Sequence, residues 1–265
     1  QKAAMGPVSR LSVAPMLDST NPYFRHFLRL VSKRTRLYTE MHVVNKLVHV
    51  DSSFLNNRVA KRREIHDGPV ALQIGGADLP LTEAAVRRLW NEGYEFNEVN
   101  LNVGCPSDRV AGKGAFGAAL MDDPELVAAL AQRAANGMPS ANEPVVSVKC
   151  RIGIARPSEF EGLVGDQKSA LAADGFRTML NYFKGDVPTD MLEARQEMLF
   201  DRLCNFVNVV SEQSPVNHFI VHAREAVSSP IAVETETEQQ GGSSAHGLVL
   251  SLIIGHRLQV RSKAE

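Results

Sequence analysis

The chain has 265 residues, of which 44% are hydrophobic and 22% are charged, and its formal net charge is −1. This composition fits one large globular domain or two small ones, and a charge so close to zero gives no global sign of nucleic-acid binding. The longest apolar run, 248–254, falls far short of the roughly 20 residues of a membrane span, so we expect no membrane partner. Three cysteines without framework spacing favour a reducing compartment. We expect the cytoplasm, or an organelle if a transit segment precedes Gln1.

Short apolar runs alternate with helical patterns along the chain. Strands are predicted at 11–16, 37–41, 70–75, 96–102, 145–150 and 218–222, and helices at 21–30 and 81–92. A third helix is predicted to begin at Pro124, with Asp123 as its N-cap, and to be ended by Gly137. Near-continuous apolar strands separated by helices predict a parallel sheet that is covered on both faces. With chemistry at several strand ends, this favours a TIM (β/α)8 barrel, and a doubly wound sheet is the alternative.

Two regions interrupt this alternation. Residues 155–202 are long for one connection, and their centre, 175–201, has a helical pattern. The polar segment 228–244 is low in complexity and is predicted to be a loop or disordered. Two further strand–helix units would need roughly 30 residues each. We therefore expect the barrel to be incomplete at strands 7 and 8.

The segment Asn100-Leu101-Asn102-Val103-Gly104-Cys105-Pro106 carries most of the functional information. It places a cysteine on a tight turn at the carboxyl end of a strand, which is where α/β folds present their chemistry. A single cysteine is more often an inert buried hydrophobe. The surrounding motifs decide between these two interpretations.

Six segments, in this order, resemble the tRNA-dihydrouridine synthases, and within them the A-type branch of bacteria, plants and algae. They are VAPMLDSTNPYFR (13–25), TEM (39–41), LQIGG (72–76), EVNLNVGCPSDRVAGKGAFGAALM (98–121), VKCRIGI (148–154) and FIVHAR (219–224). The resemblance implies a barrel that binds FMN and reduces the C5–C6 double bond of uridines in tRNA, with NADPH as reductant. The inherited substrate positions are 20 and 20a, in the D-loop.

The resemblance also implies roles for individual residues. It makes Cys105 the general acid that gives a proton to C5 of the base. The cofactor contacts it implies are Ala14, Pro15, Met16, Gln73, Lys149 and His222. The contacts to substrate or tRNA are Asn102, Arg109, Lys113, Arg151 and Arg224, with a structural role as the alternative for Arg151. No metal is expected, and the oligomeric state is not predicted.

Basic residues gather near the N-terminus and form two groups. They are Arg25, His26, Arg29, Lys33, Arg34 and Arg36, followed by the run Lys61-Arg62-Arg63. Such a set predicts either contacts with the tRNA backbone or a solvated helix face.

The family pattern weakens after residue 225. Relatives of this type continue into turns that bind the FMN phosphate and then into a helical tRNA-binding domain, whereas only 240–242 and 254–257 resemble those turns here. We therefore expect a barrel domain over 11–225 with an unusual insertion at 155–200, an atypical and partly disordered tail at 226–265, and no helical C-terminal domain. A flavin barrel that acts on free pyrimidines, and a tRNA-binding remnant without cofactor or catalysis, are the functional alternatives.

Overall fold

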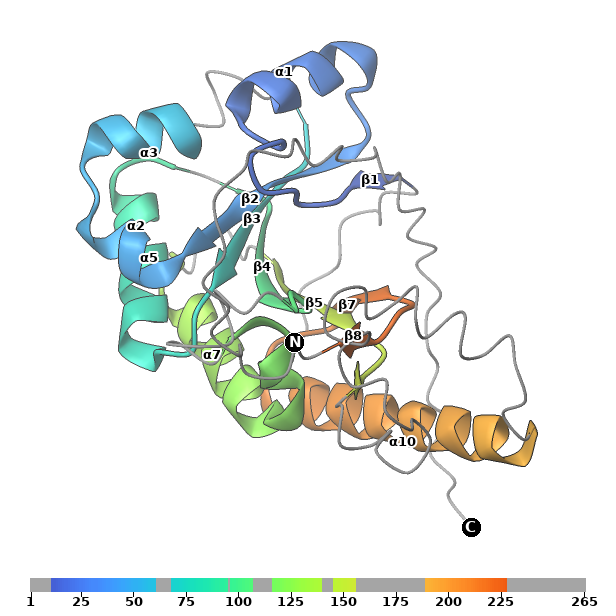
Figure 1. Ribbon diagram of the computed structural model, residues 1–265. Coiled ribbons are helices and arrows are strands. Elements are labelled where there is room, and N and C mark those ends of the chain that lie inside the picture. The colour runs from blue at the N-terminus through green and yellow to red at the C-terminus, as the bar shows by residue number, and fades with distance from the viewer. Residues whose placement is uncertain are drawn as a thin grey trace, which may run out of the picture.

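The computed structural model describes residues 11–60, 68–94, 96–106, 116–139, 145–155 and 189–227. Within them, six parallel strands lie side by side in chain order (Figure 1). They are β1 (Ser12–Val13), β2 (Arg36–Val43), β3 (Val70–Gly75), β4 (Glu98–Val103), β5 (Val145–Arg151) and β7 (His218–His222). A doubly wound sheet would reverse its strand order at a switch point. Within the described residues the uniform order is that of part of a (β/α)8 barrel, and it shows that the doubly wound alternative was wrong.

Helices connect these strands and cover one side of the sheet. They are α1 (Pro22–Val31), α2 (Val44–His49), α3 (Ser52–Arg58), α5 (Leu79–Asn91), α7 (Pro124–Asn136), α10 (Thr189–Gln213) and the 3-10 helix η1 (Gly117–Asp122). Helices α2, α5, α7 and α10 contact one another in that order along the outer side of the sheet (Figure 1). The predicted start of α7 is confirmed, since the carboxylate of Asp123 accepts the N–H of Leu126 and Pro124 occupies the first turn.

The structure moves several predicted boundaries. Strand β1 is two residues long and not six, because Pro15 has no N–H to pair with a neighbouring strand. Helix α10 begins at Thr189 and continues to Gln213, twelve residues past the predicted end at 201; the segment 175–188 lies outside the described residues. Two short strands that sequence patterns missed, β6 (Ile154–Ala155) and β8 (Ala226–Val227), form a separate parallel pair.

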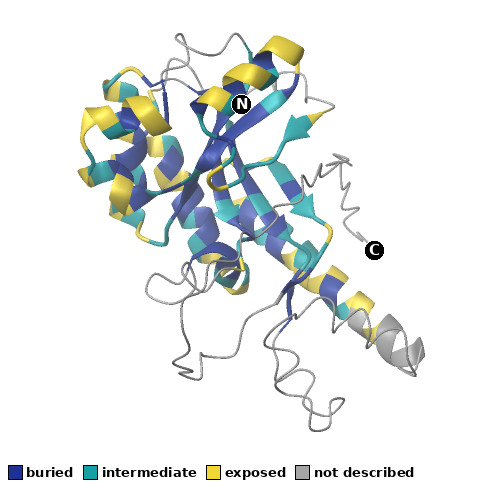
Figure 2. Cartoon of the chain, turned by 45° about the horizontal axis from the view of Figure 1, so that its top comes forward, coloured by how far each residue is buried: buried dark blue, intermediate teal, exposed yellow. Residues whose placement is uncertain are grey.

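The two faces of the sheet differ in chemistry. On β4 and β5 the side chains packed against the helices are Val99, Leu101, Val103, Val146, Val148 and Cys150, all of which belong to the main apolar core. The residues between them are Glu98, Asn100, Asn102, Ser147, Lys149 and Arg151, and they point to the opposite face. The strands are largely buried (Figure 2). They were predicted as near-continuous apolar runs, but β4 and β5 alternate, so the inner face of the half-barrel is polar.

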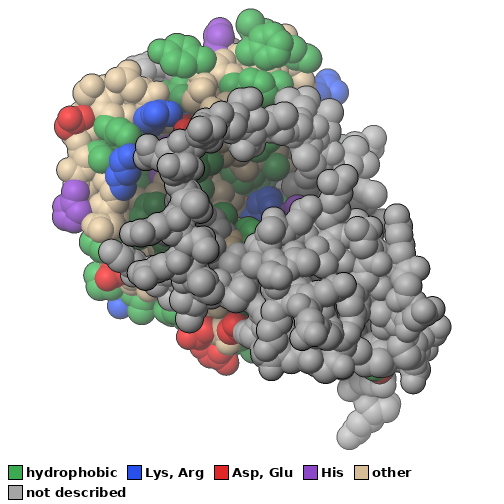
Figure 3. Space-filling model, in the orientation of Figure 1, with side chains coloured by type: hydrophobic (Ala, Val, Ile, Leu, Met, Phe, Trp, Pro, Cys, Tyr) green, Lys and Arg blue, Asp and Glu red, His purple; other side chains and the backbone are tan. Residues whose placement is uncertain are grey.

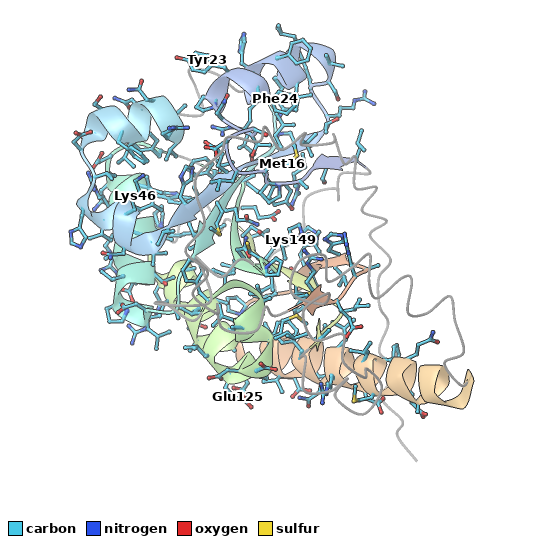
Figure 4. The ribbon with its side chains drawn as sticks, viewed as in Figure 1. Met16, Tyr23, Phe24, Lys46, Glu125 and Lys149 are labelled. Carbon is cyan, nitrogen blue, oxygen red and sulfur yellow. The ribbon has the colours of Figure 1, made fainter. Side chains whose placement is uncertain are left out.

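Helix α1 differs from an ordinary amphipathic helix, because it buries two arginines and exposes several apolar side chains. Its buried side chains include Arg25, whose guanidinium donates to the carbonyls of Thr20 and Val59, at 2.6 Å each. Arg29 is also buried and donates to three further carbonyls, those of Ser32, Thr35 and Pro69. The outward side of the helix exposes Tyr23, Phe27, Leu30 and Val31. Figure 4 shows Tyr23 on this side.

For Arg25 and Arg29, both interpretations of the N-terminal basic cluster, contact with the tRNA backbone and a solvated helix face, were wrong. Arg25 and Arg29 are neither on a solvated face nor able to reach an RNA backbone, because their guanidinium groups fix α1 to the loops around it. The second basic run, 61–63, lies outside the described residues.

We expect Arg25→Met to lower the free energy of unfolding by about 3 kcal/mol, because it leaves two buried carbonyls without their donor. Urea denaturation followed by circular dichroism measures this change. Lys33→Met, at an exposed position just after the helix, is the matched control and should change stability by less than about 0.5 kcal/mol. Equal effects of the two substitutions would contradict an anchoring role for Arg25.

We expect stability to fall on acidification, in part because of His42. Burial, followed by the charges of Arg25, Lys46 and Arg58, lowers the pKa of His42 from 6.5 to about 3. At pH values between these two pKa values, His42 is protonated in the unfolded chain and neutral in the folded chain. The free energy of unfolding therefore decreases as the pH falls through this range. The slope is at most about 1.4 kcal/mol per pH unit. Urea unfolding at several pH values between 7 and 4 should show a shallower slope for His42→Leu, and an unchanged slope would refute this origin.

Candidate active site

The predicted site residues of four different strands meet at the carboxyl edge of the sheet. Gln73 lies near the end of β3, Asn102 near the end of β4, and His222 at the end of β7. In the strand register Asn102 is opposite Lys149 of β5, and Arg151 is opposite His222. Lys149 lies at the centre of the view in Figure 4, where the space-filling view shows basic and histidine side chains in a recess (Figure 3).

The cysteine turn after β4 is fixed at several atoms. The backbone N–H groups of Gly104 and Cys105 donate to Oδ1 of Asn102, at 3.2 and 3.0 Å. The carbonyl of Gly104 accepts from Nε of Arg151 at 2.9 Å, and the carbonyl of Cys105 accepts from the N–H of Ala118 at 2.9 Å. The Cys105 side chain is half-buried. A rigid turn therefore presents a partly accessible thiol at the strand end.

The side-chain amide of Asn102 makes three hydrogen bonds within the protein. Its oxygen already accepts two backbone N–H groups, and its Nδ2 donates to Oε1 of Gln73 at 3.1 Å. Nε2 of Gln73 in turn donates to Oδ1 of Asn100 at 2.8 Å. Because an amide nitrogen carries two hydrogens, Gln73 and Asn102 each keep one donor. The side chain of Asn102 can thus offer a ligand a donor and no acceptor.

Lys149 is the most desolvated cation of the site. Burial, followed by the charge of Arg151, lowers the pKa of its ammonium group. No carboxylate of the described residues lies within salt-bridge distance of it. A partly buried cation in this situation gains from an anionic or carbonyl-rich ligand.

His222 is neutral at pH 7. Burial, followed by the charges of Arg151, Lys149 and Arg224, lowers its pKa to about 4. A neutral imidazole beside three cations can donate one hydrogen bond without adding a further positive charge. The carbonyl of His222 accepts the N–H of Arg224 at 2.6 Å, which places Arg224 on the loop directly after β7.

Arg151 joins the cysteine turn to that loop. In addition to its bond to Gly104, it reaches the carbonyl of Glu225 with Nη1 at 3.5 Å. These contacts fit the structural alternative given for this residue. Contact with a tRNA phosphate stays a prediction, as it does for Arg109 and Lys113, which lie outside the described residues.

The segment after β1 includes Met16, whose backbone groups form hydrogen bonds within the protein. The N–H of Met16 donates to Oγ1 of Thr20 at 3.0 Å, and the carbonyl of Met16 accepts from the same residue. Both backbone groups of Met16 are therefore engaged in a local turn. Ala14 and Pro15, with the Met16 side chain, are what this segment offers to a ligand.

Sequence reasoning missed a layer of polar residues beneath the site. Glu98 has no exposed surface, and its carboxylate pairs with Arg36 and accepts from Tyr38 at 3.2 Å and from Ser147 at 2.5 Å. Ser147 also accepts from Nδ2 of Asn100 at 2.7 Å. The available signal was a polar residue at every second position of EVNLNV and VVSVKCR, which marks a polar inner face.

The same contacts correct the expectation for Arg36, which had been grouped with the basic cluster. Its guanidinium is turned into the half-barrel towards Glu98 and is mostly buried. His218 lies 3.7 Å from the same carboxylate, but burial and then the charge of Arg36 lower its pKa to about 4, so this contact is no ion pair at pH 7.

The donor set fits the pyrimidine end of a flavin. That ring system presents carbonyl oxygens and a ring nitrogen as acceptors, and this edge of the sheet offers the spare N–H groups of Gln73 and Asn102 and the ammonium of Lys149. In the described part of the chain, no group of three or more His, Cys, Asp and Glu side chains is arranged to hold a metal ion. The described helices include none with the length and apolar character required to cross a membrane.

Comparison with known proteins agrees with this geometry. The profile of the dihydrouridine synthase (Dus) family matches residues 12–170, so the chain belongs to this family. The matched range extends beyond residue 154, which is the last residue of the resembling segment VKCRIGI.

Similar curated proteins carry the name tRNA-dihydrouridine(20/20a) synthase. The protein from Synechocystis sp. is 45% identical over 157 residues, which are 59% of this chain and 43% of that protein. The one from Escherichia coli (strain K12) is 37% identical over 231 residues, 86% of this chain and 51% of that protein. The one from Vibrio vulnificus is 36% identical over 229 residues, 86% of this chain and 54% of that protein. The chain thus spans about half the length of the curated relatives it matches.

We expect the three cysteines to differ sharply in their reaction with iodoacetamide in the folded protein. Burial raises the pKa of Cys150 to about 12, and its side chain is inaccessible, so it should stay unmodified at pH 8. Cys105 and Cys204, which are both half-buried, should react. Peptide mass spectrometry after timed alkylation gives the three rates, and modification of Cys150 before unfolding would contradict its placement in the core.

Proposed function

We propose that this chain is the flavin-binding barrel part of a tRNA-dihydrouridine synthase. In this proposal it reduces uridines at positions 20 and 20a of the D-loop to dihydrouridine, with FMN as cofactor and NADPH as reductant. The observation that carries the proposal is the juxtaposition of a fixed Cys105 turn with the donors of Asn102, Gln73 and Lys149 on adjacent strand ends, in a member of this family.

Each protein group has a defined task in this reaction. When bound by these groups, a reduced flavin would supply the hydride for C6 of the uracil ring. The π electrons of the C5–C6 bond then shift towards C5, where the Cys105 thiol gives up its proton and forms the new C–H bond. The resulting thiolate regains a proton from water. The target base has to leave the RNA stack before its ring can reach a thiol on a strand end.

Lys149, Gln73 and Asn102 bind and orient in the proposed mechanism. The ammonium of Lys149 lies in a desolvated position where it would stabilise negative charge on the cofactor ring. The amide donors hold carbonyl oxygens in place, and neutral His222 adds one further donor or acceptor. Ala14, Pro15 and Met16 complete the proposed cofactor contacts, while Arg109, Lys113, Arg151 and Arg224 are proposed contacts to substrate or tRNA.

The domain division also belongs to this proposal. We assign 11–225 to the barrel, with 155–200 as an insertion and 226–265 as a tail. The segments that resemble phosphate-binding turns, 240–242 and 254–257, lie outside the described residues. The cytoplasm, or an organelle, remains the expected compartment.

The proposal is tested first by flavin retention. The purified chain is mixed with FMN, excess cofactor is removed, and the visible absorption spectrum is recorded. We expect a protein-perturbed flavin band, and we expect Lys149→Met to weaken FMN affinity at least about tenfold, which corresponds to about 1.4 kcal/mol. Lys33→Met, at the exposed position used above, is the charge-matched control. A colourless protein that binds tRNA in a salt-sensitive manner would instead favour the remnant hypothesis.

We expect Cys105→Ala to keep the flavin band but to lower dihydrouridine formation on unmodified tRNA by about 10²-fold or more, because the general acid is lost. Cys204→Ala, on helix α10, is the matched control and should keep full activity. Product is measured by mass spectrometry of digested tRNA. Undiminished activity of Cys105→Ala would remove the thiol from the mechanism, and reduction of free uracil by the parent chain would favour the free-pyrimidine alternative.

A further inference from the structure

A continuous row of hydrogen bonds crosses the inner face of the half-barrel, from a carboxylate at the bottom to the cysteine turn at the top. We propose that Glu98, acting through Ser147 and Asn100, is a positioning group that fixes which way the amides of Gln73 and Asn102 point. It thereby fixes the Cys105 turn and leaves Asn102 with a donor, and no acceptor, for a ligand. The consequence for ligands rests on the proposed function, whereas the effect on the turn does not.

The lower end of the row has a fixed polarity. The carboxylate of Glu98 is held by Arg36 and, as an acceptor without hydrogens, requires the Ser147 hydroxyl to donate to it, at 2.5 Å. A hydroxyl has one hydrogen. Ser147 can therefore only accept from its other neighbour, and the NH₂ group of Asn100 must face it, at 2.7 Å.

The orientation of Asn100 in turn fixes the orientations of the Gln73 and Asn102 amides. With its nitrogen towards Ser147, Asn100 turns its oxygen to Nε2 of Gln73, at 2.8 Å. Gln73 then turns its oxygen to Nδ2 of Asn102, at 3.1 Å. The oxygen of Asn102 is left to accept the two backbone N–H groups of the turn.

The upper end imposes the same direction independently. A flipped Asn102 amide would set its NH₂ group against the N–H groups of Gly104 and Cys105, and three donors cannot satisfy one another. An acceptor-only carboxylate at one end and two backbone donors at the other therefore agree on one orientation for all three amides. This agreement orients side chains whose O and N atoms could otherwise exchange places.

The polarity defines what the site can recognise. Both acceptor positions of Asn102 and one donor of each amide are used inside the row, so Gln73 and Asn102 each keep one N–H. Lys149 beside them adds further donors. A ring carbonyl, such as those of uracil or of the flavin pyrimidine, is complementary to these N–H groups, and the exocyclic amine of cytosine is not.

The decisive variant is Asn100→Asp, which keeps the size of the side chain and removes its donor. The new carboxylate and Glu98 would compete for the single hydrogen of Ser147, and the row would break. At low pH the new carboxyl group, whose pKa is raised by burial beside Glu98, becomes protonated and can donate to Ser147 again. The defect should therefore be present in alkaline solution and relieved in acid.

The readout is the alkylation rate of Cys105 by iodoacetamide in the cofactor-free protein, with Cys204 of the same molecule as the internal reference. We expect the Cys105 rate of Asn100→Asp, relative to the parent at the same pH, to rise at least about fivefold near pH 8.5 and to return towards the parent value near pH 6, since the protonated carboxyl group restores the row. Ser147→Ala should raise the rate at every pH, because alanine cannot be rescued by protonation. Thr82→Val removes a buried hydroxyl from α5, away from the row, and should leave the rate unchanged.

Three outcomes would overturn the inference. A Cys105 rate within about twofold of the parent at all pH values would show that the row does not hold the turn. A rate raised equally at all pH values would assign the effect to packing and not to hydrogen-bond polarity. If Asn100→Asp shows no cooperative thermal unfolding, Ser147→Ala decides: an alkylation rate like that of Thr82→Val would overturn the inference. Because the assay needs neither flavin nor tRNA, its result stands even if the proposed function fails.

Discussion

Glu98 carries a carboxylate with no exposed surface in the middle of the sheet, and such a group is tolerated only where donors surround it. Arg36 and Tyr38 of β2 and Ser147 of the adjacent strand β5 are those donors. The carboxylate therefore holds together β2, β4 and β5 below the site. Its acceptor character also sets the direction of the hydrogen bonds above it, up to the turn that presents Cys105.

The division of the sheet into two faces explains how a small half-barrel holds both a core and a reactive site. Alternate side chains of β4 and β5 enter the apolar core under α5, α7 and α10, while their neighbours form the polar inner face. Parallel strands end at a common edge, so the last inward residues of four strands come together there. Lys149 is held in this desolvated position with no carboxylate of the described residues beside it, which prepares it for an electron-rich ligand.

Helix α1 shows that burial does not follow hydrophobicity where directional bonds are available. Arg25 and Arg29 are buried because loop carbonyls around them need donors, and their guanidinium groups supply several each. Four apolar residues of the helix then face outward, with Tyr23 81% exposed. The periodicity of the helix was predictable, but the face that it buries was not, since one carbonyl partner of each arginine, that of Val59 and that of Pro69, is distant in sequence.

The sequence alone determined the order of the six sheet strands and of the helices α1, α5 and α7, the cap at Asp123, the bounds of β3 and β7, and the presence of a cysteine turn after a strand, because each of these depends on short-range signals. Resemblance added the identities of the site residues. Only the tertiary structure decided that β1 is short, that Arg36 turns inward, and that Asn102 has no spare acceptor. These features depend on contacts between residues such as Ser147 and Glu98, 49 positions apart, whose pairing is set by the register of neighbouring strands and leaves no local pattern.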